Sequence, residues 1–194
     1  MDQIEKRIKK GVEYLNNGKP KRALYQFKKV IEIDPKNIDG HAGAAMAYTA
    51  LEQISDAENC LKKATELNPD DSRAWYNLGS FYISQKCFGE ALECFNKSNQ
   101  LKPNDSVILV GIGSALVGLN RYDEAMECFD QALSIDDKNV QAILGKGLVL
   151  IMADKYDESI KYFERALEIE PDLVSAKAII KMVQNAKATE REND

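Results

Sequence analysis

The sequence has a single histidine, His41, and only four cysteines in 194 residues. Zinc sites and most nucleophilic active sites need several such side chains close together, and no CxxC motif or group of histidines is present. No nucleophile–base pair can be argued around His41, so we expect a buried packing role for it. The composition therefore predicts no metal, no cofactor and no enzyme.

Long hydrophobic runs are also missing. The longest nearly apolar stretch, residues 107–119, has 13 residues and is interrupted by Ser114, whereas a membrane-spanning helix needs about 20 apolar residues. Residues 1–18 are charged and lack the apolar core of a secretory signal. The cysteines fit a reducing compartment and are expected to be packing residues. We therefore expect a cytoplasmic protein with no membrane span.

A pattern that returns every 34 residues dominates the sequence. Its columns contain Gly11, Ala45, Gly79, Gly113 and Gly147; Tyr14, Tyr48, Tyr82, Leu116 and Leu150; Ala23, Ala57, Ala91, Ala125 and Ser159; Phe27, Leu61, Phe95, Phe129 and Phe163; and Pro35, Pro69, Pro103, Asp137 and Pro171. Within each unit the apolar residues recur at spacings of 3 and 4, which is typical of helices. Five units in one register predict a helical repeat array, whose function lies in a surface.

The third unit resembles the tetratricopeptide repeat (TPR). It reads Trp75-x-x-Leu78-Gly79-x-x-Tyr82, then Ala91-x-x-x-Phe95, then Pro103. The other units are partial copies, in which the tryptophan column holds Arg7, His41, Leu109 and Ile143. The resemblance covers residues 4–173 and implies an all-α, right-handed solenoid of five helix-turn-helix repeats plus a C-terminal capping helix.

The repeat register divides one predicted domain, residues 1–194, into repeats 4–37, 38–71, 72–105, 106–139 and 140–173, a capping helix 174–187 and a polar tail 188–194. Helix starts are predicted after four residues whose side-chain oxygens can accept the free N–H groups of a first turn: Asn37, Asp71, Asp105 and Asn139. We expect Ile179, Ile180 and Val183 of the capping helix to cover the end of the fifth repeat.

In the TPR family the first helices of successive repeats line a concave groove that binds partners. Transferred by column, this resemblance predicts a partner-binding groove at Ile8, Val12, Ala42, Met46, Tyr76, Asn77, Ser80, Ile83, Val110, Ser114, Val117, Leu144 and Leu148. Tyr76 is the preferred anchor because aromatic residues dominate interface energetics. Gly43, Gly111 and Gly145 are expected to leave shallow notches in the groove.

An apolar groove predicts a protein-interaction scaffold or adaptor that binds an amphipathic helix or an apolar extended segment. The family's chaperone co-factors hold a C-terminal carboxylate with two lysines, two asparagines and an arginine, but the matching positions here offer only Arg73 and Asn77 as basic or amide groups. The sequence therefore argues against acidic chaperone tails as partners. Occupation of the groove by the chain's own C-terminal helix or by a second copy stays open.

Charge changes along the array. Residues 1–30 contain nine Lys/Arg and three Asp/Glu, whereas residues 104–172 contain six and fourteen. The basic end is either a solvated terminal repeat, a surface that steers an acidic partner, or a contact for the acidic end of another copy. A self-assembling, homo-oligomeric protein is thus the alternative function. RNA binding is disfavoured because the pI is about 5.1 and few aromatics lie among the basic residues.

Overall fold

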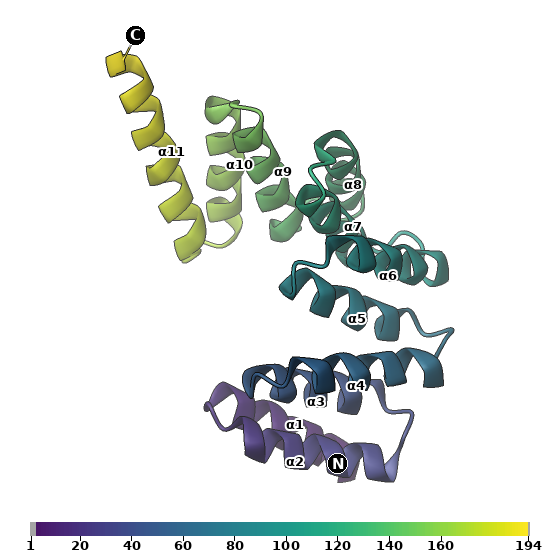
Figure 1. Cartoon of the computed structure of the whole chain (residues 1–194). Coiled ribbons are helices and arrows are strands. Elements are labelled where there is room, and N and C mark those ends of the chain that lie inside the picture. Colours follow the sequence, from purple (N-terminus) through teal and green to yellow (C-terminus); the bar gives the residue numbers. More distant parts are fainter. Residues whose placement is uncertain (1–2, 194) are drawn as a thin grey trace. The chain divides into compact units, whose positions relative to one another are not determined.

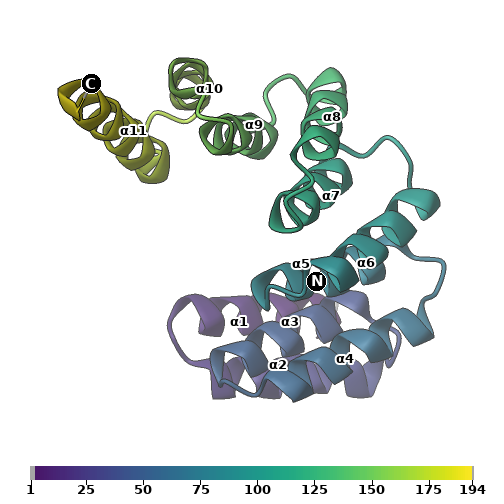
Figure 2. The same ribbon diagram turned by 45° about the horizontal axis from the view of Figure 1, so that its top comes forward.

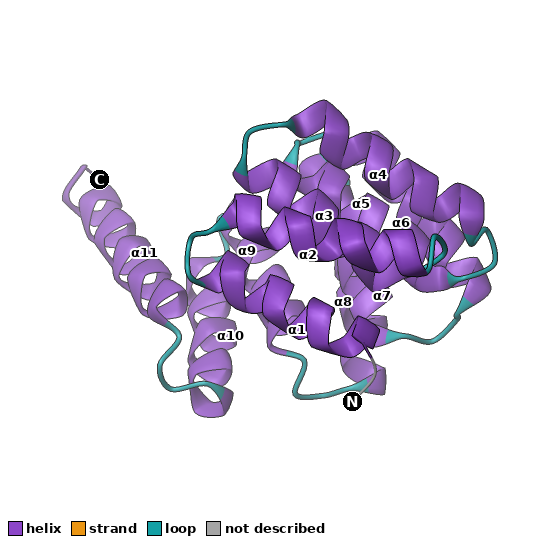
Figure 3. Cartoon of the chain, turned by 90° about the horizontal axis from the view of Figure 1, so that it is seen from below, coloured by secondary structure: helices purple, strands orange, loops and turns teal. Residues whose placement is uncertain are grey.

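A computed structural model describes the backbone of residues 3–193 and the side chains of residues 3–185. Within this described part all the regular secondary structure is helical, with loops between the helices and no strand (Figure 3). The helices are α1 Gln3–Asn16, α2 Pro20–Ile33, α3 Ile38–Ala50, α4 Ile54–Leu67, α5 Ser72–Ser84, α6 Phe88–Leu101, α7 Ser106–Gly118, α8 Tyr122–Ile135, α9 Val140–Met152, α10 Tyr156–Ile169 and α11 Val174–Asn193. The all-α, tetratricopeptide-type fold predicted from the sequence is confirmed.

The helices begin where the polar capping residues were predicted. Asn37 accepts a hydrogen bond from the backbone N–H of Gly40 at 2.8 Å, and Asn139 accepts one from Ala142 at 3.1 Å. Asp71 accepts one from Arg73 at 2.9 Å, and Asp105 one from Val107 at 2.9 Å. Each cap satisfies an N–H group that has no partner inside its helix. These contacts fix the start of every first helix after the first repeat.

The turn inside each repeat contains one residue in the left-handed backbone region. The five residues are Gly18, Glu52, Lys86, Asn120 and Asp154, with φ between 56° and 65°. Gly18 takes this conformation without steric strain, and Asn120 and Asp154 belong to the types that tolerate it best among residues with a Cβ. At Glu52 and Lys86 the periodic φ therefore reflects a turn geometry that the repeat imposes on residues that do not favour it.

The described structure forms two compact units, Met1–Gln85 and Lys86–Asp194. In unit 1, α1 packs against α2 and α3, and α3 packs against α4 and α5 (Figures 1 and 2). Its core includes Ala23, Phe27, Ala44 and Ala47, all nearly inaccessible to solvent. Glu58 of α4 also accepts a hydrogen bond from the Tyr82 hydroxyl of α5 at 2.9 Å. This bond fixes α5 to α4.

In unit 2, α7 packs against α6, α8 and α9, and α10 packs against α9 and α11 (Figure 1). The capping role of α11 agrees with burial of Val183, at 3% exposure, and partial burial of Ile179 and Ile180. Helix α11 continues to Asn193, beyond the predicted end at 187, because no glycine or proline interrupts this segment. Of the predicted polar tail, Asp194 lies outside the described residues.

Candidate interaction surface

The predicted groove residues of unit 1 lie on α1, α3 and α5, and none of them is fully buried. Met46 is 62% exposed and Val12 is 46% exposed, although both are large apolar side chains. Ile8 is half-buried because it also packs against the core around Phe27. The remaining predicted residues are half-buried: Ala42, Tyr76, Asn77, Ser80 and Ile83. We call this surface the first-helix face of unit 1.

The predicted groove residues of unit 2 lie on α7 and α9. Leu148 is 40% exposed, and Val110, Ser114, Val117 and Leu144 are half-buried. Leu144 packs partly against the buried cluster around Ile143, so it contributes to the core as well as to the surface. The Ser114 hydroxyl donates to the carbonyl of Val110 at 2.8 Å and is therefore satisfied within its own helix. This part of the predicted surface is mainly apolar.

The predicted glycine notches do not exist. Gly43 and Gly111 are buried, and a Cβ added to either, or to Gly145, would collide with a phenylalanine ring of the preceding second helix. Phe27 lies between Gly11 and Gly43. Phe129 lies in the same way between Gly113 and Gly145. The glycines are needed because the ring of each second helix fills the space between two first helices.

The second repeat departs from this arrangement. Its second helix has Leu61 where the other four repeats have phenylalanine, and the flanking positions hold Ala45 and Asn77. Leu61 is 3% exposed and smaller than a phenylalanine ring. A nearby column on the first helices changes from a small to a large side chain. Phe81 stands at a position that holds Ala47 and Ala115 in the neighbouring repeats.

A pocket of about 460 Å³ lies at this departure from the pattern. It is formed by α3, the middle of α4 and α5, and is therefore contained in unit 1. Its lining is mostly apolar, and no charged side chain contributes to it: the residues are Ala42, Ala45, Met46, Thr49, Ala50, Leu61, Asn77, Ser80, Phe81 and Ser84. Its volume falls within the usual range of ligand pockets, about 300–1,000 Å³.

Four predicted groove residues line this pocket, namely Ala42, Met46, Asn77 and Ser80, whereas Tyr76 and Ile83 do not. The sequence analysis missed Leu61 and Phe81, which give the pocket its shape. A signal was present in the aligned repeats, because each of these two residues differs in size from the rest of its column. Such size differences indicate where the regular packing of an array changes.

Electrostatic contacts fix the edges of this surface. Arg73 donates to Asp71 at 3.0 Å and lies 3.9 Å from Asp39, so its guanidinium is already paired. This pairing further weakens the case for a carboxylate clamp. On α5, burial and the hydrogen bond to Glu58 raise the pKa of Tyr82 to about 12. Tyr82 is therefore a neutral hydrogen-bond donor at physiological pH.

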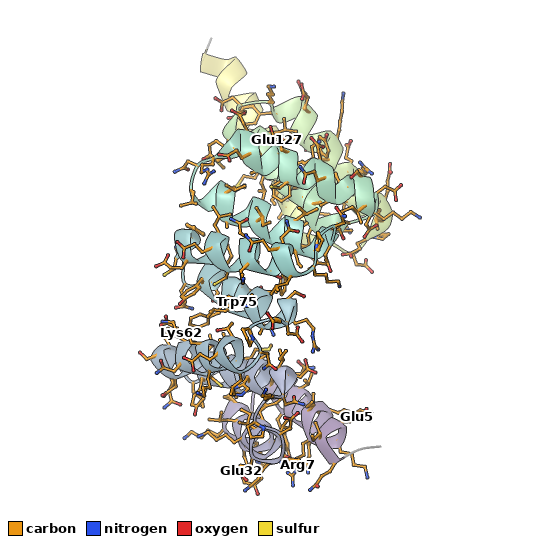
Figure 4. All side chains as sticks on the ribbon, turned by 90° about the vertical axis from the view of Figure 1, so that its right-hand side faces the viewer. Glu5, Arg7, Glu32, Lys62, Trp75 and Glu127 are labelled. Atoms are coloured by element: carbon orange, nitrogen blue, oxygen red, sulfur yellow. The ribbon has the colours of Figure 1, made fainter. Side chains whose placement is uncertain are left out.

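His41 is buried, at 4% exposure, as predicted for a packing residue. Its Nε2 lies 2.9 Å from the carbonyl oxygen of Pro35. Trp75, the tryptophan of the next repeat (labelled in Figure 4), donates from its indole nitrogen to the carbonyl of Pro69 in the same way, at 2.8 Å. Because the Nε2 proton of His41 is donated to the Pro35 carbonyl, Nδ1 carries no proton and is an acceptor. It lies 3.4 Å from the Cys60 sulfur. Burial raises the pKa of the Cys60 thiol to about 11, so this pair does not form an activated nucleophile.

Among the described residues, no disulfide joins any of the cysteines Cys60, Cys87, Cys94 and Cys128. Among the residues whose side chains are described, no three His, Cys, Asp or Glu are grouped so that they could hold a metal ion. Over the same part of the chain, no helix combines the length and apolar character needed to cross a bilayer.

The paired helices, the recurrent caps and the ring-on-glycine packing define a tetratricopeptide repeat protein. The family model described as the cilia and flagella-associated protein 70 C-terminal domain, of the TPR type, matches residues 8–177. The chain belongs to this family. No curated protein sequence matches it.

Solved structures of other TPR proteins have the same fold. A thermophilic TPR protein of Thermus thermophilus is 16% identical, with a TM-score of 0.80 over 93% of this chain and 98% of that one. PilF of Pseudomonas aeruginosa is 23% identical, with a TM-score of 0.73 over 86% and 76% of the two chains. YrrB, described as a TPR protein with an unusual peptide-binding site, is 21% identical, with a TM-score of 0.63 over 90% of each chain. At these identities the similarity concerns the fold alone.

Proposed function

We propose that the chain is a non-catalytic protein-interaction scaffold that holds an apolar or amphipathic segment of a partner against its first-helix faces. The observation that carries this proposal is the exposure of large apolar side chains in the columns expected to face a ligand. Met46 is 62% exposed, Val12 46% and Leu148 40%. Met46 also lines the mostly apolar pocket of unit 1, and contiguous apolar surface is typical of interaction sites. YrrB, which has the same fold, is described as having a peptide-binding site, and this supports the proposal.

A photo-crosslinking experiment tests the proposal. A benzophenone amino acid placed at Met46 is expected to crosslink the partner, whereas the same group at Lys63 of α4 is not. Lys63 is a suitable control because its side chain is 58% exposed on a second helix. Equal crosslinking at the two positions, or crosslinking only at Lys63, would contradict binding at the first-helix face.

Replacement of Tyr76 provides a quantitative test with the crosslinked partner. Tyr76→Ala is expected to weaken binding by more than about 1 kcal/mol, because a few aromatic side chains commonly supply most of the binding energy of an interface. The matched control is Tyr25→Ala, since Tyr25 is a 57% exposed tyrosine on α2, a second helix. Circular dichroism of both variants verifies that helicity is unchanged. Equal affinities of wild type and Tyr76→Ala would remove Tyr76 from the site.

Head-to-tail self-association is the second candidate function, and the charges of unit 1 favour it. Lys10 and Arg22 lie over the ring of Tyr14, at 5.8 and 6.0 Å from its centroid. Neither forms an ion pair with a carboxylate of the described residues, and the same is true of Lys21. Residues 104–172 contain fourteen acidic and six basic residues, so this part of a second copy offers a negative surface complementary to the basic one.

Sedimentation velocity distinguishes this second candidate. Self-association predicts a mass that rises with protein concentration at low ionic strength and falls toward that of the monomer at about 0.5 M salt, where the Debye length is only a few Å. Reversing the charges of Lys10, Lys21 and Arg22 to glutamate should also give a monomer. A constant monomeric mass at every salt and protein concentration would exclude self-association.

A further inference from the structure

The pocket of unit 1 lies beside the position where the repeat pattern normally places a phenylalanine ring. Three of its lining residues, Ala45, Leu61 and Asn77, are the counterparts of Gly113, Phe129 and Gly145 in the fourth repeat. There the ring and the two glycines fit together, and the ring is 1% exposed. In the second repeat leucine replaces the ring, and an open pocket of about 460 Å³ is found beside it. Leu61 and the Cβ atoms of Ala45 and Asn77 occupy the position of the ring itself, so the open space lies next to that position and can receive a side chain from outside the chain.

The polar groups of the pocket suit the backbone of a bound segment. Thr49 and Ser84 donate their hydroxyl hydrogens to carbonyls of their own helices, at 2.9 and 2.6 Å. The side chains of Asn77 and Ser80, by contrast, form no hydrogen bond with any other described residue. Both are half-buried and line the pocket. The Asn77 amide can donate and accept at once, which is the pairing that a peptide group requires.

The absence of charge in the lining restricts the group that enters. None of the ten lining residues is ionisable at neutral pH, so a charged side chain inserted among Leu61, Phe81 and Met46 would lose its hydration without gaining a counter-ion. A neutral, largely apolar side chain avoids this cost. An aromatic ring is favoured among such groups because Met46 can contact its edge through a polarizable sulfur.

We propose that this pocket is the anchor site for a partner segment, and that it receives one aromatic side chain while Asn77 binds the adjacent backbone of that segment. The proposal rests on the scaffold function above and specifies the chemistry of the partner. A second copy of the chain, or its own C-terminal helix, would have to offer an aromatic residue to fill the same role. Helix α11 contains none, as the sequence of residues 174–193 shows.

The binding probe is N-acetyl-L-phenylalanine amide, with N-acetyl-L-alanine amide as the control, each titrated into the full-length chain labelled with ¹⁵N. The phenylalanine probe is expected to shift the amide signals of Met46, Asn77 and Ser80 in a saturable way. The alanine probe should bind at least about tenfold more weakly, a difference of about 1.4 kcal/mol. Equal effects of the two probes, or saturable shifts only on α7 and α9, would overturn the proposal.

Two variants close the pocket by different routes. The triple variant Ala45→Gly, Leu61→Phe, Asn77→Gly copies the packing of the other repeats and places the chain's own ring in the space. Ser80→Phe blocks the pocket from its half-buried edge without changing the core, so it still tests the proposal if the triple variant does not fold. Both are expected to abolish the shifts caused by the phenylalanine probe. Undiminished binding to the folded variants would overturn the proposal.

The same variants separate this inference from the scaffold function. If Ser80→Phe binds the crosslinked partner normally while Tyr76→Ala does not, the pocket is no anchor but the scaffold function stands. If neither substitution changes partner binding, and Met46 gives no specific crosslink, the scaffold function fails as well. Loss of partner binding in Ser80→Phe, together with loss of probe binding, supports both the scaffold function and the anchor role of the pocket.

Discussion

The ring of Phe129 on α8 lies against the backbone of Gly113 on α7, so closely that a Cβ added to Gly113 would come within 2.6 Å of the ring. Phe129 is 1% exposed and is also held against Gly145, which leaves the ring no space to move aside. We predict that Gly113→Ala lowers the free energy of unfolding by about 1–3 kcal/mol because it overpacks the core. This loss should appear despite the gain of about 1 kcal/mol in helix propensity.

Urea unfolding followed by circular dichroism measures the effect, with Gly89→Ala as the matched control. Gly89 also lies in a helix of unit 2, but a Cβ there meets no atom within 4 Å, so this substitution should be neutral or stabilising. In a Phe129→Leu background, Gly113→Ala should cost clearly less, because the pair then resembles Leu61 and Ala45 of the second repeat. Equal stability of Gly113→Ala and Gly89→Ala would contradict the packing explanation.

Asp105 provides a test of helix capping. Its carboxylate accepts from the backbone of Val107 at 2.9 Å and pairs with Lys102 at 2.8 Å. Asp105→Ala should therefore lower the free energy of unfolding by about 1 kcal/mol, whereas Asp105→Asn, which keeps the capping oxygen, should cost less.

The pH dependence of this cap follows from its contacts. The bond from Lys102, followed by the bonds from the backbone, holds the pKa of Asp105 below its ordinary value. Since the folded pKa is the lower one, the contribution is complete above the unfolded pKa of about 3.9 and is lost as the pH falls through the folded value. Thermal melts at pH 7 and pH 3 should show a smaller acid effect for Asp105→Asn than for wild type. An equal loss of stability between pH 7 and pH 3 in wild type and in Asp105→Asn would contradict a stabilising role of the ionised carboxylate.

Lys146 is a lysine in a column that holds Leu78 and Ile112 in other repeats. It is 8% exposed, pairs with the carboxylate of Asp130, and lies 5.0 Å from the centroid of the Tyr162 ring. Burial lowers its pKa, but the bonds to Asp130 and Tyr162 outweigh this effect, so the pKa is raised overall. The lysine therefore stays charged in a position that suits an apolar side chain.

We predict opposite outcomes for the two partners of this ion pair. Asp130→Asn should lower the free energy of unfolding by about 1–3 kcal/mol, because a nearly buried ammonium group loses its counter-ion. Lys146→Leu should be neutral or stabilising, because an apolar residue at this nearly buried position avoids the cost of desolvating the ammonium group. Thermal melts of both variants measure these changes in stability. A strongly destabilised Lys146→Leu would show that the ion pair itself stabilises the fold.

Cys60 gives a prediction at alkaline pH. Burial raises the pKa of its thiol from 9.0 to about 11. Because the folded pKa is the higher one, the stabilising contribution is complete below about pH 9 and is lost as the pH rises toward 11, to a limit of about 2–3 kcal/mol. Between pH 9 and pH 11 the free energy of unfolding should fall more for wild type than for Cys60→Ala.

Alkylation by iodoacetamide checks the same thiol directly. In a chain with Cys87, Cys94 and Cys128 replaced by serine or alanine, the reaction of Cys60 should be slow at pH 8 and should accelerate up to about pH 11. A half-maximal rate near pH 9 would show that the thiol is not shielded from solvent by the partial burial that the structure describes.

The repeat register could be read from the sequence because its signals are local. Asn37 and Asp105 each cap the helix that follows them, and a cap needs only the chain's next few residues. The size of the gap between α3 and α5 could not be read in this way. It depends on Leu61 from a third helix and on Phe81, so several non-local contacts decide it together. For the same reason Gly43 was interpreted as a notch, although the ring of Phe27 fills that space.

The sequence by itself determined the class of fold and the starts of four capped helices, since a period of 34 residues, helical spacing and capping depend on local backbone geometry. Only the tertiary structure decided which of those columns encloses a pocket. Side chains from three helices share one space there, and whether they fill it depends on their volumes after packing. The second repeat leaves that space open beside Leu61, whereas the fourth closes it with Phe129.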